Sequence, residues 1–142
     1  MSFSKDYFFP AKIEMRWSDL DEFSIINNAK MMTYFEEARI KLLQAVEWDW
    51  QHEGIVVANA NINYRTPLKL TDNPVVYTRC SAIGNKSFTL SCVIAEQLPE
   101  GAMKVFSEAT FVLVGYDFKN KMSVKIPDDV KERLRQMFKL PQ

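Results

Sequence analysis

The sequence predicts an α+β domain in which a long helix precedes an antiparallel sheet. A largely apolar helical pattern covers residues 28–46. Four segments rich in Val, Ile, Phe, Thr and Tyr follow it between residues 55 and 117, and these residue types favour strands. Turns that contain Gly or Pro lie at residues 83–87 and 99–101. Since consecutive strands with short connections pair antiparallel, this order of elements indicates an α+β fold.

A strand and a polar loop come first. Ile13, Met15 and Trp17 alternate with charged residues, and this period of two predicts a half-buried strand over residues 7–17. Residues 18–27 are mostly polar and predict a loop. The loop therefore leads from a strand directly into the start of the long helix.

The helix predicted over residues 28–46 is apolar around most of its circumference. Its apolar residues are Met31, Met32, Tyr34, Phe35, Ala38, Ile40, Leu42, Leu43 and Val46. A polar side contains Glu36, Glu37, Arg39 and Lys41. Because this apolar arc is wider than that of a surface helix, we expect the helix to lie in the concave face of a sheet.

Four strands and a short helix complete the chain. The strands are predicted over residues 55–65, 75–83, 87–98 and 103–117. The first of them alternates apolar residues with a polar row formed by Asn59, Asn61, Asn63 and Arg65. Pro127, followed by two aspartates, predicts the start of a C-terminal helix.

Composition places residues 1–142 in a single globular domain. The chain has 142 residues, of which 47% are hydrophobic and 25% charged, as in an ordinary soluble domain. Its 18 basic residues balance 18 acidic ones, so we expect no nucleic-acid partner. No apolar run reaches the ~18 residues of a membrane span, and the N-terminus lacks the apolar stretch of a signal peptide. We therefore expect a cytoplasmic protein with no membrane partner.

The cysteines and the histidine form no ligand pattern. Cys80 and Cys92 are the only cysteines, they form no CxxC motif, and both fall within predicted strands. We expect both to be buried free thiols. The single histidine, His52, lies outside any metal-binding spacing, so no metal site is expected.

The junction between the polar loop and the long helix is the most informative part of the sequence. Asp19 and Asp21 lie on the loop, and Asn27-Asn28 stands where the helix begins. The first backbone N–H groups of a helix have no partner inside it and can hold a developing oxyanion. A carboxylate beside them can act as base or nucleophile, a combination that suits acyl transfer or thioester hydrolysis. From the loop alone, however, Asp21 is more simply a residue that accepts hydrogen bonds from nearby backbone N–H groups.

Six short motifs follow one another along nearly the whole chain. They are Arg16-Trp17-Ser18-Asp19-Leu20-Asp21, Asn27-Asn28-Ala29, Phe35-Glu36-Glu37-Ala38-Arg39, Asn63-Tyr64-Arg65-Thr66-Pro67-Leu68, Ile83-Gly84-Asn85-Lys86-Ser87 and Ile126-Pro127. In this order they resemble the hotdog-fold acyl-CoA thioesterases, and most closely the 4-hydroxybenzoyl-CoA thioesterase-like branch.

The resemblance implies a hotdog fold, in which a curved antiparallel sheet wraps around the long central helix. It also implies a homodimer or homotetramer with active sites between subunits. Asp21 would be the catalytic nucleophile or general base, and the backbone amides around Asn28 would polarise the thioester carbonyl. Coenzyme A would be part of the substrate, so no separate cofactor is expected.

Two loop positions depart from the family pattern. Many relatives read Asp-x-x-Gly-His-Val-Asn-Asn, whereas this chain has Ser24 in place of the glycine and Ile25 in place of the histidine. A polar catalytic side chain is therefore missing at Ile25. Asp21 would have to work mainly with backbone donors.

Four further residues are candidates for substrate binding. Arg65 and Lys86 carry the charge that suits coenzyme A phosphates. Ser87 follows a Gly-containing turn, from which its hydroxyl could reach substrate or water across a subunit interface. Tyr34 belongs first of all to the core and could also line an acyl channel.

Three functions remain open on the sequence. The first is an acyl-CoA thioesterase. The second is a non-catalytic module that binds acyl-CoA or acyl-carrier-protein thioesters without hydrolysing them. The third is a structural oligomerisation domain, which would show no saturable binding of acyl-CoA.

Overall fold

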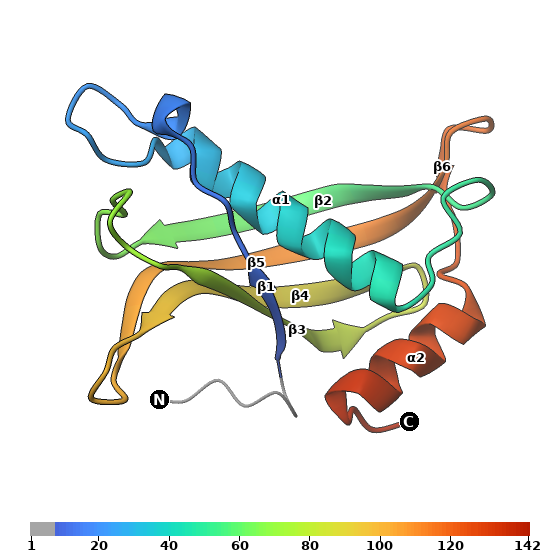
Figure 1. The fold of residues 1–142 in the computed structure, drawn as a ribbon. Helices are drawn as coiled ribbons and strands as arrows, with labels where there is room; N and C mark the ends of the chain where they lie inside the picture. The colour runs from blue at the N-terminus through green and yellow to red at the C-terminus, as the bar shows by residue number, and fades with distance from the viewer. Residues whose placement is uncertain (1–7) are drawn as a thin grey trace.

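The computed structural model describes residues 8–142, which form one six-stranded sheet and two α-helices (Figure 1). In chain order the elements are β1 (Phe9–Lys12), the 3₁₀ helix η1 (Trp17–Asp19), α1 (Asn28–Ala45), β2 (Ile55–Tyr64), β3 (Val75–Ile83), β4 (Ser87–Gln97), β5 (Met103–Asp117), β6 (Met122–Ser123) and α2 (Asp128–Phe138). Every strand pair is antiparallel, as predicted.

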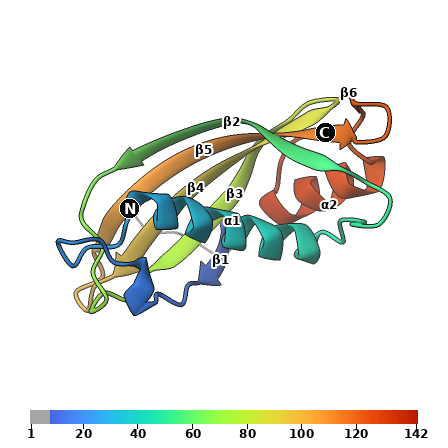
Figure 2. The same ribbon diagram turned by 90° about the horizontal axis from the view of Figure 1, so that it is seen from above.

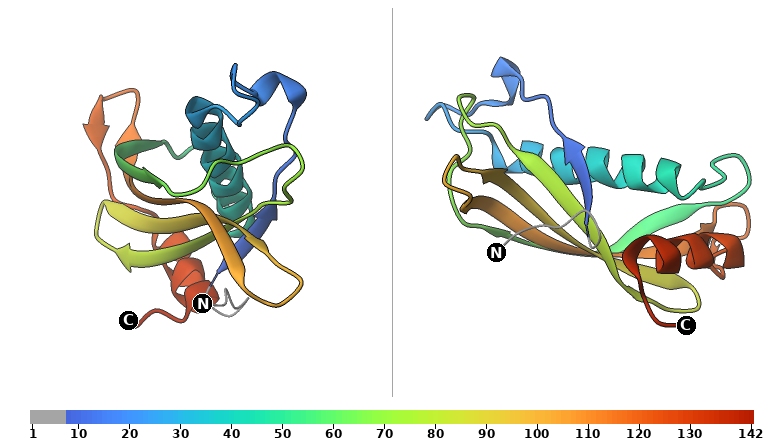
Figure 3. Two further views of the ribbon diagram at one scale, coloured as in Figure 1. Left: turned by 90° about the vertical axis from the view of Figure 1, so that its left-hand side faces the viewer. Right: turned by 60° about the horizontal axis from the view of Figure 1, so that its bottom comes forward.

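The sheet wraps around α1. Its strands follow the order β1-β3-β4-β5-β2, and β6 forms a short hairpin with the end of β5. Figures 2 and 3 show the sheet curving around the helix, with β1 near one edge and β2 at the other. α2 contacts β3 beyond the C-terminal end of α1. This arrangement confirms the predicted hotdog fold.

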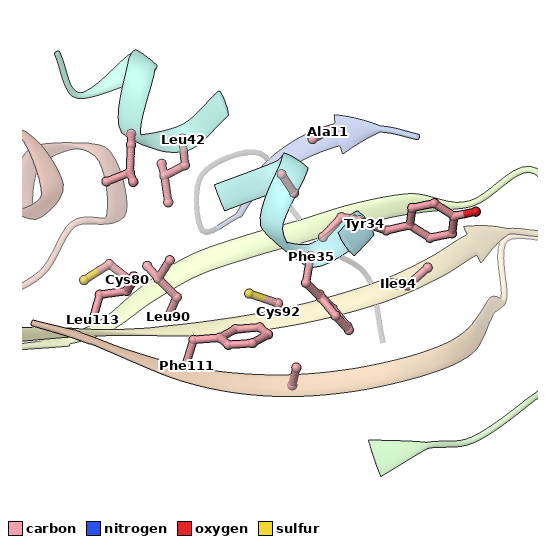
Figure 4. Close-up of a cluster of buried hydrophobic side chains, with 14 of the residues drawn as sticks. Ala11, Tyr34, Phe35, Leu42, Cys80, Leu90, Cys92, Ile94, Phe111 and Leu113 are labelled. Atoms are coloured by element: carbon pink, nitrogen blue, oxygen red, sulfur yellow. The ribbon is translucent and has the colours of Figure 1, made fainter. Parts of the chain in front are cut away.

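The core lies between α1 and the concave face of the sheet (Figure 4). At its centre Phe35 of α1 and Phe111 of β5 are both buried, and their ring centroids lie 5.6 Å apart, a separation at which aromatic pairs attract. Cys80 and Cys92 are buried free thiols in β3 and β4, as predicted. Burial raises the pKa of each thiol to about 11, so both stay protonated at neutral pH.

The first strand is shorter than the sequence predicts. β1 ends at Lys12, whose partner Val75 is the first residue of β3, so the residues after Lys12 have no strand beside them. Ile13 and Met15 still pack against the core, which explains their alternation with charged residues. Residue 7, the first of the predicted strand, lies outside the described residues.

Arg39 does not belong to the polar side of α1, where the sequence analysis placed it. The side chain is buried, its guanidinium lies 5.1 Å from the Phe111 ring centroid, and Glu36 approaches it at 3.6 Å. Burial lowers the pKa of Arg39, which remains charged at neutral pH because it starts far above 7. The aliphatic part of an arginine side chain packs well in a core, and the face of an aromatic ring attracts the guanidinium through a cation–π interaction.

Candidate active site

The loop before α1 forms a tight hairpin of its own. Leu20 and Ile26 form an isolated antiparallel bridge, and within it the Asp21 N–H donates to the Ile25 carbonyl at 2.8 Å. Ser24 adopts a positive φ of 61° at the tip, a conformation that glycine takes without strain. This geometry gives a backbone reason for the glycine that many relatives have at this position.

The Asp21 carboxylate is held by the backbone of this hairpin. Its Oδ1 accepts hydrogen bonds from the N–H groups of Phe23 at 2.8 Å and Ile25 at 3.2 Å. Among residues 8–142 no donor reaches its Oδ2 within hydrogen-bonding distance. The carboxylate is therefore fixed through one oxygen, while the other is free to accept a proton or to attack. The structural role of Asp21 in the hairpin is therefore compatible with a chemical one.

The first residues of α1 are fixed next to the hairpin. The Asn27 side chain caps the helix by accepting the Ala29 N–H at 2.8 Å, and the Asn27 N–H donates to the Asp19 carbonyl at 2.9 Å. Asn28 is the first helical residue, and within the described part of the chain its N–H has no acceptor. Such an N–H can bind an anion, because the helix dipole adds to its own partial charge.

Asp21 and Asn28 line the same cavity, which has a volume of about 430 Å³. The end of β2 and the turn after it form the other wall, to which they contribute Tyr64 and Arg65. The Tyr64 hydroxyl donates to the Asn28 carbonyl at 3.3 Å and so ties the end of β2 to the start of α1. Arg65 lies at the exposed rim, where its guanidinium contacts Glu108 at 3.0 Å. The structure thus brings together three of the six candidate residues, Asp21, Asn28 and Arg65.

A buried pair lies behind the loop, and the sequence gives little sign of it. The Tyr34 hydroxyl donates to Asp19 Oδ2 at 2.5 Å, and the Arg16 N–H donates to the same oxygen at 3.1 Å. Burial raises the pKa of Asp19, but these two hydrogen bonds and the charge of nearby Lys30 outweigh it and hold the pKa below its usual value. Burial and the bond to Asp19 raise the pKa of Tyr34. Tyr34 therefore supports the loop from below, and its contact with substrate stays a prediction.

We expect Asp19→Asn to lower the free energy of unfolding by about 1 kcal/mol at pH 7, because a neutral acceptor replaces a charged one. The folded pKa of Asp19 is below the unfolded value of about 3.9, so its contribution is complete above that pH and is lost as the pH falls further. Urea unfolding of both proteins at pH 7 and near pH 3 measures the difference. A difference that grows on acidification would contradict this assignment.

Lys86 and Ser87 lie at the other end of the sheet. Lys86 belongs to the turn between β3 and β4, and Ser87 is the first residue of β4. The Lys86 carbonyl accepts the Gly115 N–H at 2.9 Å near the end of β5. In Figure 1 this turn lies at the opposite end of the sheet from the Asp21 loop, which precedes the start of α1. Within one protomer these two candidates do not approach Asp21, and their role in substrate binding stays a prediction.

Two further properties bear on the candidate site. No three His, Cys, Asp or Glu side chains of residues 8–142 gather into a group that could hold a metal ion. Neither of the two described helices is long and apolar enough to cross a membrane. The site described above consists of a carboxylate, helix N–H groups and an arginine.

The sequence is related to a known thioesterase. The thioesterase-like superfamily matches residues 15–134. The long-chain acyl-CoA thioesterase FadM of Escherichia coli is 33% identical over 132 residues, which cover 90% of this chain and 98% of that protein.

Solved structures agree with the sequence comparison. A thioesterase from Thermus thermophilus, complexed with coenzyme A and Zn, is similar with a TM-score of 0.79 and 28% identity over 94% of this chain and 96% of that one. The 4-hydroxybenzoyl CoA thioesterase of Pseudomonas sp. strain CBS-3 shares the fold, with a TM-score of 0.78 and 14% identity over 89% and 99% of the two chains. The chain therefore belongs to the thioesterase-like superfamily and is a thioester hydrolase of the hotdog fold.

Proposed function

We propose that the protein hydrolyses acyl-CoA thioesters to a free acid and coenzyme A at the cavity between the Asp21 hairpin and the start of α1. One observation carries this proposal. A carboxylate with one free oxygen and a helix N–H without an acceptor line the same cavity. Hydrolysis of a thioester needs these two elements, a group that activates or provides the nucleophile and a donor that stabilises the oxyanion.

The Asn28 N–H would bind the thioester oxygen as negative charge develops on it. In one route Asp21 removes a proton from water, water adds to the carbonyl carbon, and the C–S bond then breaks to release the coenzyme A thiolate. In the other route Asp21 itself attacks, a mixed anhydride forms as the thiolate leaves, and water hydrolyses the anhydride. Incorporation of ¹⁸O from labelled water into the Asp21 carboxylate during a single turnover would distinguish the second route from the first.

The proposed substrate is a thioester with an apolar acyl group. Met31 lines the cavity beside Ile25 and Ile26, so an apolar wall continues from Asn28 along α1. The similarity to a long-chain acyl-CoA thioesterase supports the same class. Arg65 at the rim is suited to a phosphate of coenzyme A, for which Glu108 keeps the guanidinium in place.

We further propose that the active unit is a homodimer formed along β2, alone or within a homotetramer. β2 is a ten-residue edge strand, and exposed edges of this length usually pair with another chain or are covered. Antiparallel pairing of two copies of β2 would place the Tyr64 end of one beside the Ile55 end of the other. Lys86 and Ser87 of the second copy would then approach Asp21.

We expect light scattering to give twice or four times the mass of the chain at assay concentrations. Dilution that separates the subunits should abolish turnover, because each site would need residues of both copies. Turnover by a monomer would contradict the dimeric site.

Release of free thiol from short, medium, long and aromatic acyl-CoAs tests the proposed function. We expect the protein to release thiol from at least one of these acyl-CoAs. The length of the preferred acyl group will indicate how deep the acyl pocket is. If acyl-CoA bound in calorimetry but released no thiol over hours, the protein would be the non-catalytic binding module. We place the reaction in the cytoplasm, where the free thiols Cys80 and Cys92 stay reduced.

A further inference from the structure

The start of α1 offers a single backbone donor to the catalytic cavity. The Ala29 N–H donates to the Asn27 side chain at 2.8 Å. The N–H groups of Lys30 and Met31 donate to the Asn27 carbonyl at 2.9 and 3.2 Å. Of the first four helical N–H groups, therefore, that of Asn28 alone has no acceptor among residues 8–142. Because oxyanion holes usually combine two donors, a second one would come from a side chain that lines the cavity.

Several polar side chains of the cavity are engaged elsewhere or cannot donate. The Asp21 carboxylate only accepts hydrogen bonds. The Asn27 side chain is oriented by its bond to the Ala29 N–H, and the Arg65 guanidinium is held by Glu108 at 3.0 Å. Tyr64 is different, because its donor lies directly at the start of the helix.

The Tyr64 hydroxyl is a rigidly placed donor. It lies 3.3 Å from the carbonyl oxygen of Asn28, to which it donates. The backbone beneath it is fixed, since Tyr64 pairs with Ser107 of β5 and the next N–H, that of Arg65, donates to the Phe106 carbonyl at 2.8 Å. A tyrosine side chain has only two torsions, so its hydroxyl stays near this place. The side chain is 46% exposed, which leaves it open to a ligand in the cavity.

The present hydrogen bond of Tyr64 is weak and easily exchanged. At 3.3 Å it exceeds the usual length of an O–H···O bond, about 2.5–3.0 Å. The Asn28 carbonyl also belongs to the regular ladder of α1, so it keeps a helical donor if the hydroxyl turns away. A hydrogen bond from the same hydroxyl to a negatively charged oxygen is roughly twice as strong as one to a neutral oxygen. Development of charge on a nearby oxygen therefore favours the exchange.

We propose that the Tyr64 hydroxyl is a catalytic donor that joins the Asn28 N–H in binding the oxyanion of the tetrahedral thioester intermediate. This inference rests on the proposed function and adds a side chain to an oxyanion site that otherwise has one backbone donor. As the nucleophile adds to the thioester carbon, the π electrons of the carbonyl move onto its oxygen, and the hydroxyl donates to that oxygen while keeping its own proton. When the C–S bond breaks, the oxygen becomes a carbonyl again, and the hydroxyl returns to the Asn28 carbonyl.

Tyr64→Phe removes the hydroxyl and keeps the ring. We expect kcat on the preferred acyl-CoA to fall by a factor of about 10², the usual effect of one oxyanion donor, while KM stays within about twofold. The midpoint of thermal unfolding should fall by about 2 °C at most, because one long, exposed hydrogen bond contributes little to stability. Tyr77→Phe, which removes a tyrosine hydroxyl on β3 outside the cavity, is the matched control and should keep the wild-type kcat. An unchanged kcat in Tyr64→Phe overturns the proposal.

The same hydroxyl ties β2 to α1, so a second measurement separates this structural contact from catalysis. Two analogues of the preferred substrate are compared in calorimetry. One is a ketone in which a difluoromethylene group replaces the thioester sulfur; its carbonyl adds water and so presents the tetrahedral oxygen of the intermediate. The other is an S-alkyl thioether of coenzyme A, which has no oxygen at that position.

For Tyr64→Phe we expect the Kd of the fluorinated ketone to rise about tenfold and that of the thioether to stay unchanged. Equal weakening of both analogues would mean that the hydroxyl only shapes the cavity, and it would overturn the proposal, as would unchanged binding of both. Thr66→Val removes the other hydroxyl of the cavity. Loss of turnover and of ketone binding in Thr66→Val, with neither loss in Tyr64→Phe, would assign the donor to Thr66 instead.

The binding comparison also separates this inference from the proposed function. If the wild type released no thiol from any acyl-CoA, the proposed function would fail, and the two analogues would decide on Tyr64 alone. A loss of affinity in Tyr64→Phe that is specific to the ketone would still support the donor. Binding of neither analogue by the wild type would overturn it.

Discussion

Asp21→Asn is expected to lower kcat on acyl-CoA by a factor on the order of 10²–10⁴, the usual contribution of a general base. The asparagine amide cannot remove a proton from water or form an anhydride. Its carbonyl oxygen can still accept the N–H groups of Phe23 and Ile25, so the hairpin should keep its shape. Free-thiol release and urea unfolding of the same preparation measure the two effects separately.

Asp21→Ala provides the matched comparison. It removes the hydrogen-bond acceptor as well as the charge, so it should lose turnover to a similar extent and also disturb the hairpin. Near-normal turnover by Asp21→Asn on the best substrate would rule out Asp21 as base or nucleophile. The hydrogen bonds that its Oδ1 accepts from the hairpin backbone would then be the whole function of this residue.

The elements with regular periodicity could be predicted from the sequence. α1 and the strands β3 and β5 begin where predicted, because each has clear turn residues at its ends. The bulges could not be predicted, because a bulge depends on the partner strand: β2 departs from simple alternation between Val57 and Asn59, β3 between Cys80 and Ala82, and β5 between Val105 and Ser107. The two-residue strand β6 is too short to give any period.

Residues that depend on tertiary contacts could not be predicted in the same way. Arginine on a helix ordinarily faces water, and only the neighbouring Phe111 ring on β5 explains why Arg39 is buried. The hydrogen bond between Tyr34 and Asp19 joins residues 15 positions apart, across a loop whose shape the sequence does not specify. Asp21 and Asn28 are different, because a loop that enters a helix keeps them close without any long-range contact. Lys86 and Ser87 lie at the other end of the sheet within one protomer, and only the proposed dimer would bring them to Asp21.

Asn28→Pro is expected to lower kcat by a factor on the order of 10²–10³, the usual effect of removing one oxyanion donor. Proline has no N–H, yet it fits the first position of a helix, where no internal hydrogen bond is lost. The preceding Asn27 has φ −60° and ψ 136°, a conformation that a following proline favours. The helix should therefore form normally, and circular dichroism with thermal unfolding will show whether it does.

The control for this substitution is Asn28→Ala, which keeps the backbone N–H and removes only the side chain. Because the proposed donor belongs to the backbone, Asn28→Ala should retain most of the turnover while Asn28→Pro loses it. If both variants lost activity equally, the Asn28 amide side chain would be the group that contacts the thioester. If neither lost activity, the oxyanion would be stabilised elsewhere, and the start of α1 would only position the Asp21 hairpin through the bond between the Asn27 N–H and the Asp19 carbonyl.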